Sequence, residues 1–189
     1  MKQLAIYLQA ISFFPPALRD SIFDIVNEDI RQKNEFYHKA GRVCPYIWYL
    51  ESGLIRIYQI KNGKEVTIWI QEANEIFMAP DSTLDRTLSG LFIQAIEPTV
   101  AWRTTIEDVE RTCEQHPEFH AHYRRINAIY RRIAMDRETD LTALTTTQRF
   151  EKLLKKHPSW FHRVPHAILQ SYLGMSKNTY EDLRKIYGV

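Results

Sequence analysis

The last 25 residues, 165–189, constrain this sequence more than any other stretch, because they hold two short amphipathic helices separated by a glycine. Gly174 supplies the left-handed backbone conformation that ends many helices. Ser176 then suits the N-cap of the second helix, since its hydroxyl can accept a hydrogen bond from a free backbone amide. Helix, short glycine-containing turn and helix make up the helix-turn-helix motif, which places the start of its second helix in the DNA major groove. The apolar positions expected on the inner faces are Ile168, Leu169, Tyr172, Leu173, Tyr180, Leu183 and Ile186.

The second of these helices supplies the candidate DNA-binding residues. Its first turn is polar, and Lys177 and Asn178 belong to the residue types that read guanine and adenine. Glu181 and Asp182 weigh against DNA, because carboxylates near phosphates or base edges are unfavourable. The alternative is an ordinary amphipathic helix with a solvated polar face. The candidates are Ser176, Lys177, Asn178, Thr179, Glu181, Arg184 and Lys185.

The charges are distributed unevenly along the chain. Residues 121–189 hold 13 Lys and Arg against 6 Asp and Glu, a net charge of +7, whereas residues 1–120 hold 12 against 17, a net charge of −5. A basic C-terminal part joined to an acidic N-terminal part is typical of a sensor domain linked to a polyanion-binding domain. The alternative is that the excess reflects ordinary helix surfaces.

Composition excludes several classes of protein. No apolar run approaches the ~20 residues of a membrane span, and residues 1–10 contain no signal-peptide core with a cleavage site. We therefore expect a cytoplasmic protein with no membrane partner. Cys44 and Cys113 are too few for a disulfide framework or a thiolate-bound cluster, so each is expected to be a small buried residue.

No signature of catalysis or metal binding stands out. His116 and His120 lie one helical turn apart, a spacing that can chelate a metal, but Pro117 interrupts the helix and His122 points elsewhere. The sequence contains no Gly-rich phosphate loop, nucleophile elbow or His-Glu-x-x-His motif. We expect no metal site, no cofactor and no enzymatic activity.

The middle of the chain predicts short β-strands. Asn62 and Gly63 separate two alternating runs, 54–60 and 65–70, and Asn-Gly is the strongest short hairpin signal because both turn residues need positive φ. Further strands are predicted over 35–39, 47–50, 91–96 and 99–102. Short strands with regular turn signals favour a sandwich or a jelly roll. Residues 3–33 are predicted to be helical, broken at Pro15 and Pro16, and to cap this β region.

Helices dominate the second half. Thr105 suits the N-cap of a helix over 106–115, and a long helix is predicted over 118–141. Its apolar residues repeat every three or four positions, as in a coiled coil, and we expect this seam to form a homodimer. The alternative is that the seam packs on the chain's own β domain. The seam residues are Phe119, Tyr123, Ile126, Tyr130 and Ile133.

The order of these elements, with the segments 49–56, 62–67 and 156–176, resembles the catabolite-activator and fumarate–nitrate-reduction (CRP/FNR) family of bacterial transcription factors. The resemblance implies an α+β fold. Residues 1–117 would form an effector domain, a cyclic-nucleotide-binding-like β jelly roll (a double-stranded β-helix). Residues 118–141 would form the dimerisation helix, and residues 142–189 a winged helix-turn-helix. The implied function is transcription regulation by an effector-modulated homodimer that binds a palindromic promoter site.

The chain departs from this family at the cyclic-nucleotide site. In the family a Gly-Glu-Leu carboxylate holds the ribose and an Arg-Ser or Arg-Thr guanidinium holds the phosphate. Residues 78–80 and 89–90 stand at those places and supply neither charge. Because a buried phosphate needs a charged partner, we expect no cyclic AMP binding in the usual mode, and either another small-molecule effector or none. Arg86 could substitute, or it could be an ordinary surface arginine. The candidate effector pocket comprises Phe77, Met78, Ala79, Arg86, Ser89 and Gly90.

The chain also departs from the family at the recognition helix. The family often carries Arg-Glu at its start and another Arg one turn later, where this chain has Lys177, Asn178 and Asp182. The sequence ends at Val189, directly after this helix, so we expect a helix-turn-helix that lacks the wing. The alternative function is a sensor or protein-interaction module of the same fold that does not bind DNA.

Overall fold

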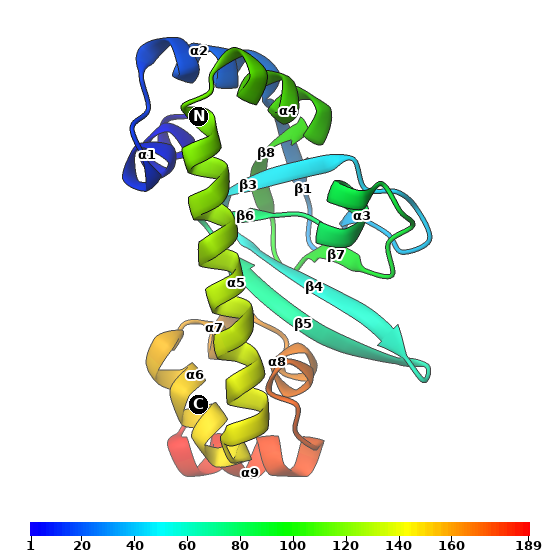
Figure 1. Ribbon diagram of the computed structural model, residues 1–189. Helices are drawn as coiled ribbons and strands as arrows, with labels where there is room; N and C mark the ends of the chain where they lie inside the picture. Colours follow the sequence, from blue (N-terminus) through cyan, green and yellow to red (C-terminus); the bar gives the residue numbers. More distant parts are fainter.

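Two four-stranded antiparallel sheets form the centre of the N-terminal half in the computed structural model, which describes residues 1–189 (Figure 1). The architecture is α+β. In one sheet the strand order is β1 (Asn27–Arg31), β8 (Thr99–Thr105), β3 (Tyr46–Ser52) and β6 (Glu75–Phe77). In the other it is β2 (Phe36–His38), β7 (Phe92–Ala95), β4 (Leu54–Lys61) and β5 (Lys64–Glu72).

The β4–β5 hairpin closes where the sequence predicts it. Lys61 pairs with Lys64 at the end of the ladder. Between them Asn62 and Gly63 have φ of 51° and 73°, as a type I′ turn requires. The turn twists the two strands in the right-handed sense, and the hairpin extends beyond the rest of its sheet (Figure 1).

The space between the sheets is filled by aromatic and aliphatic side chains. Trp48 and Phe77 stack with ring centroids 5.3 Å apart, and Tyr37 packs edge-on against both of them. The Tyr37 hydroxyl is hydrogen-bonded to Thr99 at 2.7 Å. Burial of these large side chains stabilises the facing sheets. The fully packed cluster comprises Tyr37, Cys44, Trp48, Leu50, Ile55, Ile57, Phe77, Ala79, Ile93, Ala95 and Ala101.

Helices α1 (Lys2–Ile11), α2 (Pro16–Ile25) and α4 (Ile106–Gln115) lie together at one end of the molecule (Figure 1). The first two are the helical cap that the sequence predicts. The predicted helix over 3–33 is wrong at its end, because residues 27–31 form strand β1. Pairing with β8 decides this segment, and Asp29 is buried where it accepts a hydrogen bond from the Trp48 indole N–H at 3.0 Å. Three further elements that the pattern did not predict are β6 and the short helices α3 (Pro80–Asp85) and α7 (Trp160–Arg163).

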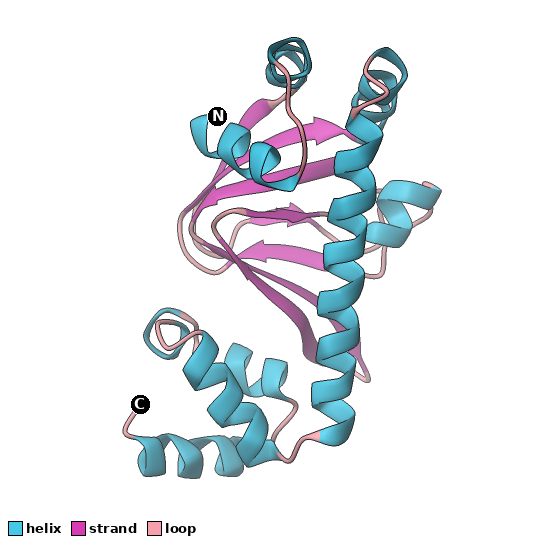
Figure 2. Ribbon diagram, turned by 60° about the vertical axis from the view of Figure 1, so that its left-hand side comes forward, coloured by secondary structure: helices cyan, strands magenta, loops and turns pink.

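Helix α5 (Phe119–Ala143) runs from this cap to the opposite end of the molecule (Figures 1 and 2). Part of its apolar seam packs on the chain itself. Phe119 is buried, and Ile126 and Tyr130 pack on the same cluster as the N-terminal helices and the first sheet. The Ile76 amide donates to the Tyr130 hydroxyl at 2.8 Å. The chain's own N-terminal half therefore covers part of the seam, as the alternative expects, whereas Tyr123 and Ile133 stay partly exposed and the homodimer stays a prediction.

Four helices complete the C-terminal end: α6 (Thr146–Lys156), α7 (Trp160–Arg163), α8 (His166–Leu173) and α9 (Lys177–Tyr187). They enclose a cluster centred on Phe150, which is fully buried. Leu54, Ile70 and Ile96 of the β domain belong to the same cluster. The β domain and the helical end thus share one core.

Polar contacts reinforce this junction between β5 and α8. The Thr67 amide donates to the Ser171 hydroxyl oxygen at 2.9 Å, and that hydroxyl donates to the Glu65 carbonyl at 3.1 Å. These bonds fix the first helix of the C-terminal pair against the hairpin.

No helix of the protein combines the length and the apolar character that crossing a membrane requires.

Candidate nucleic-acid interface and effector region

The turn between α8 and α9 has the geometry that the sequence predicts. Gly174 adopts φ 63° and ψ 45°, the left-handed conformation. The Ser176 hydroxyl accepts a hydrogen bond from the Thr179 amide at 3.2 Å, which caps α9. Tyr180 and Leu183 form the buried face of α9, so this helix presents its opposite face to solvent.

The predicted DNA-binding residues fall into two groups on α9. Ser176, Lys177, Asn178 and Lys185 are exposed, and Thr179, Glu181 and Arg184 are partly buried. Arg184 and Glu181 form an ion pair at 3.6 Å within the helix, so their charges largely offset each other. Asp182 is exposed on the same helix.

One predicted inner position of α9 is wrong. Ile186 is 73% exposed. Tyr187 packs inward instead, with its ring centroid 5.5 Å from that of Phe150. Consecutive residues of a helix point about 100° apart, so only one of the two side chains can face the interior, and here it is that of Tyr187.

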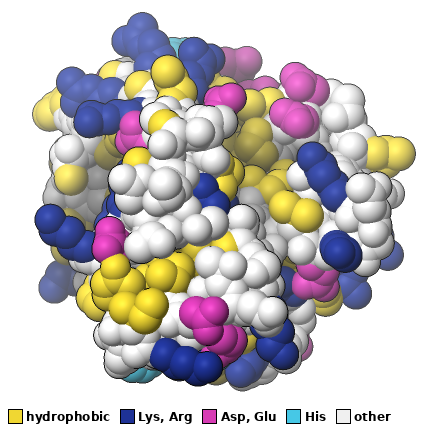
Figure 3. All heavy atoms as spheres, turned by 90° about the horizontal axis from the view of Figure 1, so that it is seen from below, with side chains coloured by type: hydrophobic (Ala, Val, Ile, Leu, Met, Phe, Trp, Pro, Cys, Tyr) yellow, Lys and Arg dark blue, Asp and Glu magenta, His cyan; other side chains and the backbone are white.

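The end of the molecule that carries α9 does not present a uniform basic surface. Viewed from this end, Lys and Arg side chains lie around the rim, and Asp and Glu side chains lie among them (Figure 3). Apolar atoms are exposed beside them. The basic character that a polyanion would meet is therefore local to a few side chains.

The six predicted effector residues do not line a common cavity. Phe77 and Ala79 are part of the packed interior between the sheets. The Ser89 hydroxyl oxygen accepts a hydrogen bond from the Leu91 amide at 3.0 Å, which shapes its own loop, and Gly90 is exposed. Met78 lines the apolar cavity beneath α5, and the other five do not.

Arg86 lies on the outside of the molecule. Its guanidinium is within 3.5 Å of Glu107 and 3.4 Å of Glu110, both on α4, and its side chain is 59% exposed. It sits at the C-cap of α3 with φ 55°, so the chain turns away from the interior there. The prediction of Arg86 as a pocket residue is wrong, and the surface alternative describes it.

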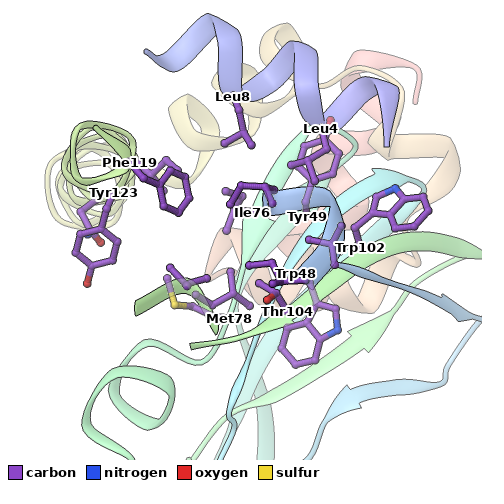
Figure 4. A pocket seen from close by; sticks show the side chains of 17 residues that line it. Leu4, Leu8, Trp48, Tyr49, Ile76, Met78, Trp102, Thr104, Phe119 and Tyr123 are labelled. Carbon is purple, nitrogen blue, oxygen red and sulfur yellow. The ribbon is translucent and has the colours of Figure 1, made fainter. Parts of the chain in front are cut away.

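An apolar cavity of about 90 Å³ lies between the first sheet and helices α1, α2, α4 and α5 (Figure 4). Trp48, Tyr49 and Trp102 contribute to one wall, and Leu4, Leu8 and Phe119 face them. No charged residue lines it. The sequence holds a signal for it: residues 47–50 are apolar without alternation, which indicates a strand buried on both faces.

Glu75, on β6, is a buried carboxyl group close to α5. Burial, together with the Glu72 carboxylate, raises the pKa of Glu75 to about 7. A carboxyl whose pKa is higher in the folded state holds its proton there while the unfolded chain has released it. Stability should therefore fall as pH rises from about 4.5 to about 7, and change no further above that.

Replacing Glu75→Gln should raise the free energy of unfolding at pH 8 by about 2 kcal/mol and change it little at pH 4.5. Urea unfolding at the two pH values measures this difference. Glu114→Gln is the control, since Glu114 is exposed and this substitution should change the free energy of unfolding by less than about 0.5 kcal/mol. An equal effect of Glu75→Gln at both pH values would contradict the buried-carboxyl explanation.

No group of three His, Cys, Asp or Glu residues is placed to hold a metal ion. His116 is hydrogen-bonded to Ser21 at 2.9 Å, and His122 is fully buried with Nε2 3.1 Å from the Leu8 carbonyl oxygen. Cys44 and Cys113 are buried free thiols, as predicted.

Protein-family models and curated proteins provide no match to this sequence. Solved structures do. A variant of CooA from Carboxydothermus hydrogenoformans has a TM-score of 0.67 at 17% identity, over 97% of this chain and 84% of that one. CLP, the c-di-GMP-responsive global regulator of Xanthomonas campestris, has a TM-score of 0.73 at 12% identity, over 92% of each chain.

A transcriptional regulator of the CRP/FNR family from Eubacterium rectale has a TM-score of 0.71 at 14% identity, over 92% of this chain and 83% of that one. These likenesses extend over almost the whole chain. The fold is that of CRP/FNR-type transcription regulators, as the sequence resemblance implied.

Proposed function

We propose that this chain is a bacterial transcription regulator that binds DNA as a homodimer through the exposed face of α9. The observation that carries the proposal is the placement of Lys177 and Asn178. Both are exposed at the start of a helix whose other face is buried, within a fold shared with transcription regulators. In this proposal residues 142–189 form the helix-turn-helix domain, and the facing sheets form a jelly-roll effector domain.

The chemistry of the first turn of α9 suits base recognition. A lysine ammonium can donate to guanine O6 and N7, and an asparagine amide can pair with adenine through two hydrogen bonds. Lys185, which is exposed two turns further along α9, can contact a phosphate. Asp182 opposes these contacts, so the net attraction depends on how the helix enters the groove.

The proposed dimer forms through α5, on the part of the helix that the β domain leaves accessible. Ile126 and Ile133 of the seam are only partly buried, and Ile129, which lies between them on the helix surface, is 44% exposed. Neighbouring apolar side chains of this kind on a long helix can form the contact with a partner helix. Two-fold symmetry would place the two α9 helices on a palindromic site with half-sites about 34 Å apart. A change in the β domain would shift the two α5 helices and reset that spacing.

Several features support a regulator that does not bind cyclic AMP in the usual mode. The space between the sheets is packed with aromatic side chains, and Arg86 is paired on the outside with α4. The cavity beneath α5 has no charged lining residue. A cyclic phosphate would find no charged partner at either place.

Replacing Lys177→Ala or Asn178→Ala should relax sequence preference by about 1–3 kcal/mol at one base pair, because each change removes a base contact. Fluorescence anisotropy with a set of operator variants measures this loss once a binding sequence has been selected. Lys185→Ala should weaken binding to all sequences alike, as loss of a phosphate contact does. Lys33→Ala, a change of equal charge on the β domain, should leave DNA binding unaltered. Uniform effects from all four variants would contradict base recognition by α9.

The second candidate is a sensor whose helical end contacts a protein, and exposed Asp182 favours it. A salt titration separates the two functions. DNA binding should weaken linearly in a plot of log affinity against log salt, with a slope of about −0.9 per phosphate contact. No DNA affinity at low salt would favour the protein-binding function.

A further inference from the structure

A second cavity, of about 250 Å³, lies where α5, α6, α8 and β5 meet. It differs in character from the apolar cavity beneath α5, because seven of its twelve lining residues are polar or charged. Four cationic side chains line it, Arg137, Arg149, Lys152 and Lys156, whereas the only lining carboxylates are Asp136 and Asp140. The lining charge is therefore positive.

Neither lining carboxylate forms an ion pair with the two arginines, although the Asp140 carboxylate acts on Arg137 at longer range. Asp140 is taken up by Lys152, with 2.6 Å between oxygen and nitrogen. Arg149 donates from Nε to the Leu173 carbonyl at 2.9 Å and from Nη1 to the Leu144 carbonyl at 2.7 Å. Carbonyl oxygens satisfy N–H groups but carry no full negative charge. Arg149 is thus oriented without a counter-ion.

Arg137 has the same arrangement. It donates to the Tyr172 carbonyl, and its guanidinium lies 3.7 Å from the centroid of the Tyr172 ring. Burial lowers the pKa of Arg137, which reflects the cost of keeping this cation out of water. Lys156, on the next turn of α6 after Lys152, forms no ion pair. A bound anion would offset the charge of all three groups.

We propose that this cavity binds a compact polyanion carrying phosphate or carboxylate groups. Arg137 and Arg149 present guanidinium groups, whose planar N–H donors match such oxygens, and Lys156 adds a mobile ammonium. Trp69 supplies an apolar wall from β5. The cavity is at the small end of ligand sites, which suits a compact molecule.

The location gives the ligand a route to control DNA binding, and this part of the inference rests on the proposed function. The wall includes Trp69 of the β domain, Arg137 of α5, Arg149 of α6 and Leu173 of α8. A ligand held by several of these groups stabilises one orientation of the helical end relative to α5. Only a ligand that prefers one orientation can shift the population.

The test is a calorimetric titration of the full chain, without DNA and at constant ionic strength, with inorganic pyrophosphate in one arm and citrate in the other. Saturable binding of either at one site per chain supports the proposal, and the better ligand identifies phosphate or carboxylate as the preferred group. Because no DNA is present, this result does not depend on whether the chain binds an operator.

Lys156→Ala should weaken binding by about tenfold, since it removes a charge-assisted hydrogen bond. Lys155→Ala is the matched control: it removes the same charge from the neighbouring position of α6, outside the cavity, and should change affinity less than about twofold. Arg137→Gln should weaken binding by at least about tenfold while keeping an amide donor for the Tyr172 carbonyl. No saturable binding in either arm, or equal losses in Lys155→Ala and Lys156→Ala, would overturn the proposal.

Discussion

Replacing Phe150→Ala is expected to lower the free energy of unfolding by about 3–5 kcal/mol, the cost of emptying a fully buried aromatic site. Phe150 has no exposed surface, and its ring packs against Phe161 and Tyr180 with centroids 5.0 Å and 5.9 Å away. The β domain contributes Leu54 and Ile70 to the same cluster. The loss should therefore appear both in helical circular dichroism and in the tryptophan fluorescence of a Trp160→Phe background, in which the remaining tryptophans, Trp48, Trp69 and Trp102, all lie in the β domain.

Phe13→Ala is the control for this experiment. Phe13 is 76% exposed, so the same substitution there should change stability by less than about 0.5 kcal/mol. Urea unfolding followed by both signals gives the two free energies. Separate transitions for the two signals in the Phe150 variant would show that the shared core does not couple the β domain to the helical end.

Replacing Gly53→Ala should destabilise the protein by about 2–5 kcal/mol, because it adds backbone strain to a steric clash. Gly53 joins β3 to β4 with φ of 93°, a region that L side chains rarely adopt. A Cβ at this position would lie 2.5 Å from the Pro98 carbonyl oxygen and 2.7 Å from Thr99 Cγ2. The first of these contacts is with backbone, which cannot move without disturbing β8.

Gly63→Ala separates the two causes. Gly63 also has positive φ, 73°, but nothing lies within 4 Å of a Cβ placed there. It should lose only about 1–2 kcal/mol, the cost of the left-handed conformation alone. Thermal unfolding of both variants measures the difference, and equal losses would mean that the close approach of residue 98 is relaxed at little cost.

Local signals were sufficient for much of the fold. The Asn62-Gly63 pair, the Thr105 cap and the Gly174–Ser176 turn act through backbone conformation over a few residues, so their outcome can be predicted from the sequence. The hydrogen bond from the Asp108 amide to Thr105 Oγ1, 3.1 Å, and the left-handed Gly174 confirm two of them.

Predictions that depended on tertiary partners were less accurate. Periodicity identified the apolar seam of α5 but could not decide whether Tyr130 meets a second subunit or residue Ile76 of the same chain. Strand β1 has a polar sequence, and only its pairing with β8 reveals it. Arg86 was a candidate for the effector pocket because it lies in the same loop as residues 78–90, but two carboxylates on α4 hold it outside. In each case a contact distant in sequence determined the result.

The shared cluster around Phe150 has a consequence for engineering. Leu54, Ile70 and Ile96 pack in one cluster with side chains of the C-terminal helices. Cutting the chain after α5 would leave these side chains in water on one fragment and strip the other of part of its interior. The helical end is therefore not an independently transferable domain. A chimaera that joins it to another sensor domain must carry a matching apolar surface on the strands that contact it.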